Sequence, residues 1–409
     1  MDETSRPFFV FTNTHDFMRF VFFFLFFFLI SFGPVLLYSF GIKRDSKLTL
    51  ISKMIKVVLS VIPIVFISYY LCSITGWVRL DFKVVCLLNI SMILFFSPLN
   101  IYLLSKAAYV YFRDKKSKRL AWLPIVGGTL AVVLFVLLAW GIADRKSLQV
   151  REVEVPLKEL PTAFDGLKIM QFTDVHVGCL DGAREYLKKI VEISNSYNPD
   201  IVMLTGDLIN VAAWEAEGTE GALNGISAKL GKYAVLGNHD YGKYTKWKCA
   251  EDSINNLDEV KSLYRGFDFD LLLNENRVIV SEEDTLYIAG MENCGEEPFP
   301  CYGDMDASLA GVGENKVLLL SHDPSTWKTH VLGYENVLMT FSGHTHAAQM
   351  GFEIGSFKFS PAQFLYDEWD GIYEKDGKYL FVSRGVGYVG LAFRLGMRPE
   401  ISVITLRAK

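Results

Sequence analysis

Four uniformly apolar stretches in the first 142 residues constrain this chain more than any other feature. They cover roughly residues 20–40, 57–75, 84–104 and 120–142. Each is close to the ~20 residues that a helix needs to cross about 30 Å of hydrocarbon. The first stretch is longer than the apolar core of a typical signal peptide and has no small-residue cleavage site after it. The sequence therefore predicts four transmembrane helices, and so an integral membrane protein that crosses the bilayer several times.

The four predicted helices contain no Asp, Glu, Lys or His. Ionisable residues within a membrane mark the ion and substrate paths of pumps and transporters, so their absence argues against a channel or a transporter. Each stretch contains one proline, which membrane helices tolerate as a kink. We therefore interpret this region as an anchor whose partner is the lipid bilayer.

Lys and Arg residues are distributed unevenly between the two sides of the predicted anchor. The first and third connections contain eleven of them, against seven on the opposite side. The richer side normally faces the cytoplasm, so we expect both termini and the segment after the fourth helix to be extracytoplasmic. The eleven residues are Lys43, Arg44, Lys47, Lys53, Lys56, Lys106, Arg113, Lys115, Lys116, Lys118 and Arg119.

The charge balance changes sign along the chain. Residues 1–150 have a balance of +10, whereas residues 151–409 have a balance of −15 and an ordinary globular composition. An acidic domain is a poor match for nucleic acid, because phosphate backbones favour a basic surface. We predict a membrane anchor over residues 1–143, a juxtamembrane linker over 144–162 and a globular domain over 163–409.

The six cysteines form no C-x-x-C pair, which argues against a zinc ribbon or a thioredoxin-type motif. Cys294 and Cys301 lie on either side of a short proline-containing loop, and they could form a disulfide in an oxidising compartment. Free thiols are equally compatible with the sequence. The oligomeric state is not determined by any feature of the sequence.

After the predicted linker, short apolar runs each end in a cluster of polar residues. Helical periodicity separates the first two runs, with apolar or small residues at Leu187, Ile190, Val191 and Ser194. Strands that alternate with helices predict a layered α/β fold in which polar strand ends meet at one edge of a sheet. The expected strands are residues 168–173, 201–205, 233–236, 317–320 and 337–341.

The polar residues at these strand ends are the types that bind transition metals. Five of the seven histidines in the chain lie there, at positions 176, 239, 322, 344 and 346, together with aspartates and one asparagine. Imidazole and carboxylate together suit manganese, iron or zinc. No cysteine accompanies them, so the pattern favours an open catalytic site over a closed structural zinc site.

In their order along the chain, these blocks resemble the calcineurin-like metallophosphoesterase superfamily over roughly residues 165–407. The anchor and the segments Val382-Ser383-Arg384-Gly385 and Pro399-Glu400-Ile401 resemble its transmembrane subgroup, some of whose members act on lipid precursors such as UDP-2,3-diacylglucosamine. One departure is Ala347-Ala348-Gln349 after His346, where that subgroup commonly has two glycines. The blocks are Asp174-Val175-His176, Gly206-Asp207, Gly237-Asn238-His239-Asp240, Ser321-His322 and Gly343-His344-Thr345-His346.

The resemblance implies a four-layer α/β/β/α sandwich and a centre with two divalent transition-metal ions. Asp207 would bridge both ions, because a carboxylate can use two oxygens whereas an imidazole cannot. His239 would be the general acid that protonates the leaving group, and Asp240 would orient it. The first ion would be held by Asp174, His176, Asp207 and His346, and the second by Asp207, Asn238, His322 and His344.

We therefore expect hydrolysis of a phosphate ester or pyrophosphate bond by metal-activated hydroxide, with a lipid-linked phosphate as the favoured substrate. The alternative is a membrane sensor or scaffold whose domain binds phosphate without hydrolysing it. For Arg384, an ion pair is favoured over phosphate binding. Packing is likewise favoured over a role at the substrate mouth for most of a set of aromatic residues, namely Trp214, Tyr241, Phe364, Tyr366 and Trp369.

Overall fold

The computed structural model describes residues 90, 93–94, 97–102, 104–106, 108–109, 122–245, 247–295, 301–355 and 357–409. The chain divides into two compact units, Met1–Ile142 and Ala143–Lys409. The first two predicted membrane helices lie outside the described residues. The third is described only in part, and its described residues are helical.

The fourth apolar stretch forms helix α4 (Leu123–Asp144). Its 22 residues correspond to a length of about 33 Å, enough to cross the hydrocarbon core of a bilayer. Among the described residues it is the one helix that is long and apolar enough to do so. Most of its large apolar side chains are exposed, for example those of Ile125 and Val132, as expected of a helix that needs an apolar environment.

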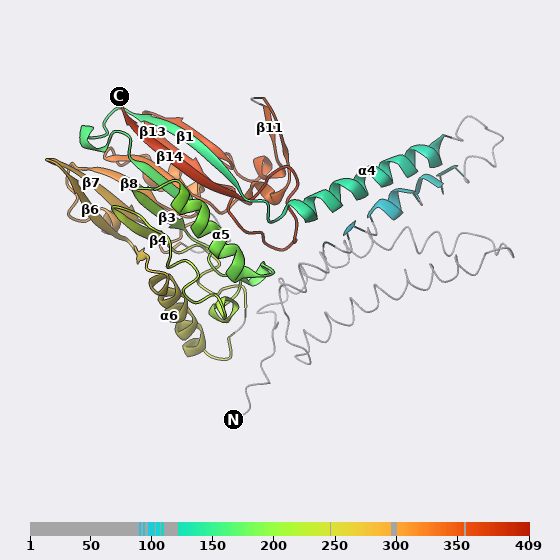
Figure 1. Ribbon diagram of the computed structural model, residues 1–409, viewed down its shortest axis with the longest axis horizontal. Helices are drawn as coiled ribbons and strands as arrows, with labels where there is room; N and C mark the ends of the chain where they lie inside the picture. Colours follow the sequence, from blue (N-terminus) through green and yellow to red (C-terminus); the bar gives the residue numbers. More distant parts are fainter. Residues whose placement is uncertain are drawn as a thin grey trace. The chain divides into compact units, whose positions relative to one another are not determined.

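The second unit contains two six-stranded sheets (Figure 1). In the first, β2, β3 and β4 run parallel, so their carboxyl ends share one edge of the sheet. Its strands in spatial order are β1 (Gln149–Leu157), β14 (Glu400–Ala408), β2 (Lys168–Phe172), β3 (Ile201–Thr205), β4 (Gly231–Val235) and β5 (Asp270–Leu271).

The second sheet has a parallel centre, because β7, β8, β9 and β13 all run in the same direction. A separate two-stranded hairpin is formed by β10 (Phe352–Ile354) and β11 (Phe357–Phe359). The strands of the second sheet in spatial order are β12 (Gly371–Lys375), β13 (Lys378–Val382), β9 (Val337–Ser342), β8 (Lys316–Leu320), β7 (Asp284–Gly290) and β6 (Glu275–Ser281).

The main hydrophobic core lies between the two sheets. Ile169, Ile201 and Val235 of the first sheet belong to the same buried cluster as Leu318 and Phe341 of the second. Side chains alternate between the two faces of a strand, so the neighbouring residues Val317 and Leu319 face the other way. They form a second buried cluster that includes Trp327, outside the second sheet.

Helical segments cover the outer faces of the sheets. Helix α5 (Ala183–Ser196) buries Leu187, Ile190 and Ser194, as their spacing predicts. The long helices are on the side of the first sheet, whereas the second is covered only by short segments, so the unit is a mixed α/β fold as expected. The other helical segments are η2 (Thr162–Phe164), η3 (Val177–Cys179), η4 (Ala213–Ala216), α6 (Ala250–Gly266), α7 (Met305–Ser308), η5 (Trp327–Val331), η6 (His346–Gln349) and η7 (Pro361–Phe364).

The predicted juxtamembrane linker of residues 144–162 is not a simple connection. It contains β1, which pairs in parallel with the last strand β14 from Gln149–Glu400 to Leu157–Ala408. Burial alternates along β1 from Arg151 to Leu157, as expected of a strand. Its partner lies about 250 residues further along the chain, so no local pattern identifies the strand with which it pairs. The first strand of the second unit therefore begins five residues after the end of α4.

Candidate metal centre

The predicted ligands lie in loops that follow the parallel strands of both sheets, and most have an unusual backbone. Five of the seven have a positive φ: Asp174 (55°), His176 (47°), Asp207 (56°), His344 (72°) and His346 (51°). Residues other than glycine seldom adopt this conformation, because the Cβ atom crowds the backbone. Strained residues of this kind cluster at functional sites, and here they turn successive side chains toward one point.

Asp174, His176 and His346 form the first group, in which one ligand atom from each residue lies within 4.8 Å of the others. The Nε2 atoms of His176 and His346 are 3.0 Å apart, and Nε2 of His346 is 3.3 Å from Oδ1 of Asp174. All three residues are buried. The backbone N–H of His344 donates to both carboxylate oxygens of Asp174, which fixes the carboxylate in place.

Asp207, His322 and His344 form the second group within the same distance limit. Oδ2 of Asp207 is 3.2 Å from Nε2 of His322. Oδ1 of Asn238 is 2.8 Å from Nδ1 of His344, so the asparagine belongs to this group by position. The other ring nitrogen, Nδ1 of His322, is 2.7 Å from the carbonyl oxygen of Thr205, to which it donates.

Asp207 lies between the two groups. Its Oδ2 is 3.7 Å from Nε2 of His176 in the first group as well as 3.2 Å from His322 in the second. Asp207 and His176 also form a third group with His239. A carboxylate shared by two sets of imidazoles is the donor arrangement expected of a dinuclear transition-metal centre.

Burial keeps most of the imidazoles neutral, which is the form that binds a metal. It lowers the pKa of His176 to about 3 and that of His344 to about 4, and it also lowers the pKa of His346. Burial raises the pKa of Asp174 to about 6. A cation at this point would favour the deprotonated form of every one of these groups.

His322 differs from the other histidines. Burial disfavours its charged form, but the adjacent Asp207 carboxylate outweighs burial and raises the pKa of His322 to about 10. Nε2 of His322 lies 3.2 Å from Oδ2 of Asp207, and Nδ1 of His176 is buried without a hydrogen-bond partner among the described residues. A cation that replaced the proton on Nε2 of His322 would be held by an imidazole and a carboxylate at once.

His239 is half-buried and lies at the edge of the ligand groups. Its Nδ1 donates to the carbonyl oxygen of Asn210 at 2.6 Å, and its ring stacks on Tyr244 with the ring centroids 4.2 Å apart. The backbone N–H of His239 donates to Oδ1 of Asp207. The residue is thus held by contacts on three sides while its ring remains partly accessible.

The prediction that Asp240 orients His239 is wrong. The Asp240 carboxylate is fully buried and accepts hydrogen bonds from the Tyr264 hydroxyl and from several backbone N–H groups, including those of Asp207 and Gly237. Burial and the charge of Asp207 raise the pKa of Asp240 to about 7. The Asp240 carboxylate therefore stabilises the loop of Asp207. The Asn210 carbonyl, and not Asp240, orients the His239 ring.

Two tyrosines hold the outer atoms of the second group, and neither role was predicted. Nδ2 of Asn238 donates to the Tyr244 hydroxyl at 2.6 Å, and Nε2 of His344 is 2.9 Å from the Tyr366 hydroxyl. From the sequence, Tyr366 belongs to the aromatic set for most of which packing is favoured over the substrate mouth, and no role is indicated for Tyr244. The sequence signal for this site is the position of polar residues at strand ends. Asn238 and His344 have that position, but neither tyrosine does, so the tyrosines could not be found in this way.

Arginines near the centre have structural contacts. Arg394 is buried, donates from Nη1 to the carbonyl oxygen of His346 and places Nη2 3.1 Å from Nδ1 of the same residue. Arg384 is also buried and pairs with Asp370, with Nε 2.6 Å from Oδ1, as the expectation of an ion pair requires. No sequence pattern indicates a role for Arg394, because it lies in an irregular loop far from the histidine blocks.

The aromatic residues proposed for the mouth divide into two sets. Tyr241 and Trp369 are buried, and the Tyr241 hydroxyl donates to Glu292. Trp214 is only partly exposed and packs edge-on against Trp247. Phe364, by contrast, is 75% exposed. Packing therefore accounts for most of the set but not for Phe364.

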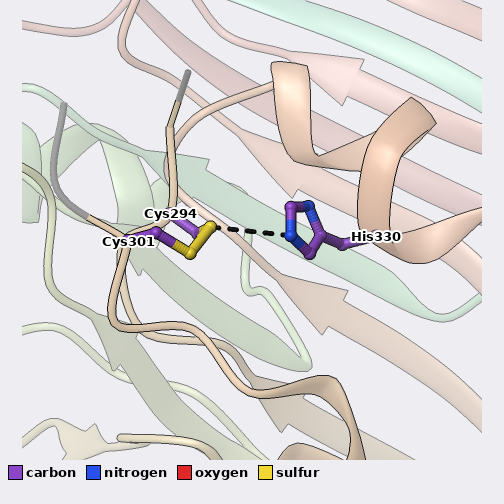
Figure 2. A group of neighbouring side chains, drawn as sticks. All are labelled: Cys294, Cys301 and His330. Atoms are coloured by element: carbon purple, nitrogen blue, oxygen red, sulfur yellow. Dashed lines mark hydrogen bonds between the residues drawn. A yellow bond between two sulfur atoms is a disulfide. The ribbon is translucent and has the colours of Figure 1, made fainter. Parts of the chain in front are cut away.

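Cys294 and Cys301 form a disulfide, as Figure 2 shows. Nε2 of His330 is 3.8 Å from Sγ of Cys294 (Figure 2). The two cysteines are also paired by an isolated β-bridge. Of the two states that the sequence left open, the structure therefore has the bonded one.

A comparison with protein families matches residues 167–348 to calcineurin-like phosphoesterases. The chain thus contains a calcineurin-like phosphoesterase domain, and the resemblance seen in the motif blocks is confirmed. The matched segment begins just before β2 and ends in η6, so it includes every predicted ligand.

Curated relatives include transmembrane proteins with a metallophosphoesterase domain. One from Danio rerio is 28% identical over 68% of this chain and 61% of its own length, and one from Bos taurus is 27% identical over 72% and 64%. An uncharacterized metallophosphoesterase of Bacillus subtilis is 27% identical over 61% of this chain and 82% of its own length. The alignments with the two animal relatives thus span less than two thirds of those proteins.

Proposed function

We propose that this chain is a membrane-anchored phosphoesterase that depends on two divalent transition-metal ions. It hydrolyses a phosphate ester or pyrophosphate bond, and the favoured substrate is a lipid-linked phosphate. The observation that carries the proposal is the pair of buried His/Asp groups that share Asp207, within a domain of the calcineurin-like phosphoesterase family. A domain that only bound phosphate would not need every ligand position filled.

The residues of the two groups would hold the ions as the motif blocks imply. Asp174, His176 and His346 would serve the first ion, while Asn238, His322 and His344 would serve the second, with Asp207 between them. When bound, manganese, iron or zinc ions supply charge neutralisation for the phosphate oxygens and a water molecule of lowered pKa. The neutral amide of Asn238 limits the negative charge of a site that must accept an anion.

His239 is the residue of this chain that we assign to proton transfer. A carbonyl oxygen can only accept, so the hydrogen bond to Asn210 fixes the proton on Nδ1 of His239. The other nitrogen, Nε2, is then the one that exchanges a proton with the leaving group. The partial exposure of the ring, in contrast to the buried ligands, is consistent with contact to a substrate.

The membrane anchor comprises residues 1–143 with four helices in this proposal, and the catalytic domain faces away from the cytoplasm. The excess of Lys and Arg in two connections supports that orientation. The disulfide between Cys294 and Cys301 supports it as well, because disulfides persist in oxidising compartments. A catalytic domain that begins directly after α4 would meet substrates in or near the bilayer.

The central experiment uses the full-length protein in nanodiscs. Metal content is measured after purification, and hydrolysis is then assayed for an aryl phosphate and for a panel of lipid phosphates and lipid pyrophosphates. We expect about two transition-metal ions per chain, activity that disappears on chelation, and its return with manganese, iron or zinc. A metal-loaded protein that binds phosphate but hydrolyses nothing would instead be a sensor or scaffold.

The orientation is tested separately with protease added to intact cells, or to spheroplasts if there is an outer membrane. Digestion of residues 163–409 is expected. Full protection of this domain, while an external control protein is cut, would place the active site in the cytoplasm and restore cytoplasmic lipid precursors as substrates.

A further inference from the structure

The β10–β11 hairpin has one strongly apolar face. In its antiparallel register Phe352 is opposite Phe359, and Ile354 is opposite Phe357, so these four side chains share a face. The rings of Phe352 and Phe359 stack with centroids 5.4 Å apart. Yet Phe352, Ile354 and Phe357 are 45%, 70% and 59% exposed. The described part of the chain thus leaves this face largely open.

The apolar face continues onto η7 and the residue that follows it. Phe364 contacts the ring of Phe359 edge-on, with centroids 6.3 Å apart. Phe364 and Leu365 are 75% and 79% exposed. Contiguous exposed apolar surface of this kind marks a site of interaction with a protein or a membrane. We call the set Phe352, Ile354, Phe357, Phe359, Phe364 and Leu365 the apolar patch.

The opposite face of the hairpin is charged and is fixed to the domain. Glu353 forms an ion pair with Arg384, and Lys358 lies 2.8 Å from Asp370. Asp370 in turn pairs with the buried Arg384. The hairpin is therefore amphipathic by strand alternation, and its ion pairs hold it with the apolar patch directed outward. Figure 1 shows the hairpin standing out from the sheets of the domain.

One short loop, residues 395–398, contacts both the base of the hairpin and the last residue of α4. Gly351 donates to the carbonyl oxygen of Leu395, and Leu395 donates to that of Gln349. Three residues further on, Arg398 pairs with Asp144, the last residue of α4, at 2.8 Å. Residues 395–398 therefore place the hairpin at the end of the domain where the chain leaves the proposed anchor.

The apolar patch also adjoins the metal centre. The Ser360 hydroxyl donates to the carbonyl oxygen of Ala347, the residue after His346, at 2.6 Å. Tyr366, next to Leu365, contacts His344 through its hydroxyl. A surface that bound the patch would thus lie a few residues away from the ligands of both groups.

We propose that the apolar patch inserts into the lipid bilayer and holds the active site at the membrane surface. The proposal rests on the membrane anchoring proposed above. A bilayer is the apolar partner that chain connectivity already brings to this end of the domain. An amphipathic element with its apolar face outward is the form in which proteins bind the interfacial region. The patch would give the enzyme direct access to lipid-linked phosphates.

The depth of the patch is measured in full-length protein in nanodiscs, with Cys72, Cys86 and Cys249 replaced by serine. A polarity-sensitive fluorophore is attached at Leu365→Cys, at Ile354→Cys or at the control Val280→Cys. Val280 is 62% exposed and lies on β6, at the far edge of the second sheet. At positions 354 and 365 we expect blue-shifted emission that nitroxide-labelled lipids quench. At position 280 we expect neither the blue shift nor the quenching.

Two outcomes overturn the proposal. Emission at 354 and 365 that matches position 280 would show that the patch stays in water. A blue shift without quenching by the labelled lipids would show that a second copy of the chain or another protein covers it. Neither measurement depends on catalysis, so failure of the proposed phosphoesterase activity would be recognised separately.

The effect on function is tested with the triple variant Ile354→Ser, Phe357→Ser, Leu365→Ser and the control Val278→Ser, Val280→Ser. All five side chains are more than half exposed, so the variants are expected to fold. The triple variant should lose about tenfold or more of its rate on a lipid phosphate in the bilayer, while its rate on a soluble aryl phosphate stays unchanged. Equal rates on both substrates for the triple and control variants would contradict the proposal.

Discussion

The candidate metal centre and the β10–β11 hairpin depart from ordinary protein packing in opposite ways. The candidate metal centre buries charged and polar side chains, such as Asp174 and His346, on a backbone with positive φ. The hairpin has a regular backbone, but it exposes large apolar side chains such as Ile354 and Phe357. Each arrangement is costly for a domain on its own, because buried charges and exposed apolar patches are the exceptions in folded proteins.

Under the two proposals, each region is matched by a partner of suitable chemistry. Cations would compensate the crowded carboxylates and imidazoles of the candidate metal centre, and lipid would cover the apolar patch. The two regions are joined through η6 and η7, where Ser360 contacts the residue after His346. Variants that alter one region and leave the other intact therefore separate the two roles.

The largest effect is expected for Asp207→Ala, which removes the carboxylate shared by the two ligand groups. Loss of both ions should lower the rate on an aryl phosphate by about 10³-fold or more, since two-metal assistance contributes several kcal/mol. Metal analysis and steady-state kinetics measure this, with Asp367→Ala, an exposed aspartate, as the control. The fluorophore depth at position 365 should not change. Full activity after metal removal would contradict the metal mechanism.

His239→Ala should keep both metals and lose about 10²–10⁴-fold in rate, the usual contribution of a general acid. The loss should shrink for aryl phosphates with acidic leaving groups, which need no proton. His330→Ala is the control. A loss of metal would instead assign His239 as a ligand, a role that its proximity to His176 and Asp207 permits.

Arg384→Met should act on the hairpin and on stability, although the buried Asp370 would keep Arg151 and Lys358 as partners. Leaving a buried charge unpaired costs about 3–5 kcal/mol, and the loss here should be smaller because these two cations remain. Arg384 and Arg151 together hold the pKa of Asp370 well below its usual range. The free energy of unfolding is obtained by chemical denaturation in detergent. Lys328→Met, which breaks the pairs of a partly exposed lysine with Asp367 and Glu368, should cost about 1 kcal/mol or less. Equal effects would show that the network does not hold the hairpin.

Metal affinity should rise with pH by about tenfold per unit between pH 7 and pH 9. Without metal, the pKa of His322 is about 10, so a bound cation must displace its proton. The stability of the metal-free protein should change in the opposite direction. The raised pKa of His322 contributes stability below about pH 6.5, which is lost as the pH rises through 10. Calorimetry in buffers of different ionisation enthalpy measures the released proton, and binding without proton release would contradict this account.

The smallest effect is expected for Ala348→Gly. Ala348 has φ 49°, which costs roughly 1–2 kcal/mol for a residue with a Cβ atom, whereas glycine loses about 0.5–1 kcal/mol in chain entropy. The variant should be more stable by a few tenths to about 1 kcal/mol. Ala347→Gly has the same backbone strain but loses a buried methyl group in the cluster with Trp369, so it should gain nothing. A thermal melt of both variants tests this difference.

Much of the second unit was predictable because the sequence patterns of its strands are local. The expected strand at residues 201–205 is β3, and that at 337–341 is within one residue of β9. Polar side chains at the ends of parallel strands share a sheet edge, which is why His176, Asp207 and His322 meet in space. The apolar run of residues 120–142 corresponds to α4.

The remaining features depend on contacts between residues far apart in the sequence. The alternation within β1 does not reveal that its partner is β14. The Asn210 carbonyl that orients His239 and the hydroxyls of Tyr244 and Tyr366 leave no periodic pattern. The hairpin strands have three residues each. This is too short for an alternation of apolar and polar residues to stand out in a segment that is rich in aromatic residues. Their exposure is also invisible in sequence, where Phe357 and a core phenylalanine look the same.

The sequence by itself thus determined the apolar spans, the order of the strands along the chain and the set of side chains proposed to bind metal, because local periodicity and residue chemistry encode them. The tertiary structure decided which group orients His239, how Asp240 is used and which apolar side chains remain uncovered. The physical reason is that hydrogen-bond partners and exposure are properties of chain packing, and packing brings Arg384 to Glu353 and Arg398 to Asp144 across 31 and 254 residues of sequence.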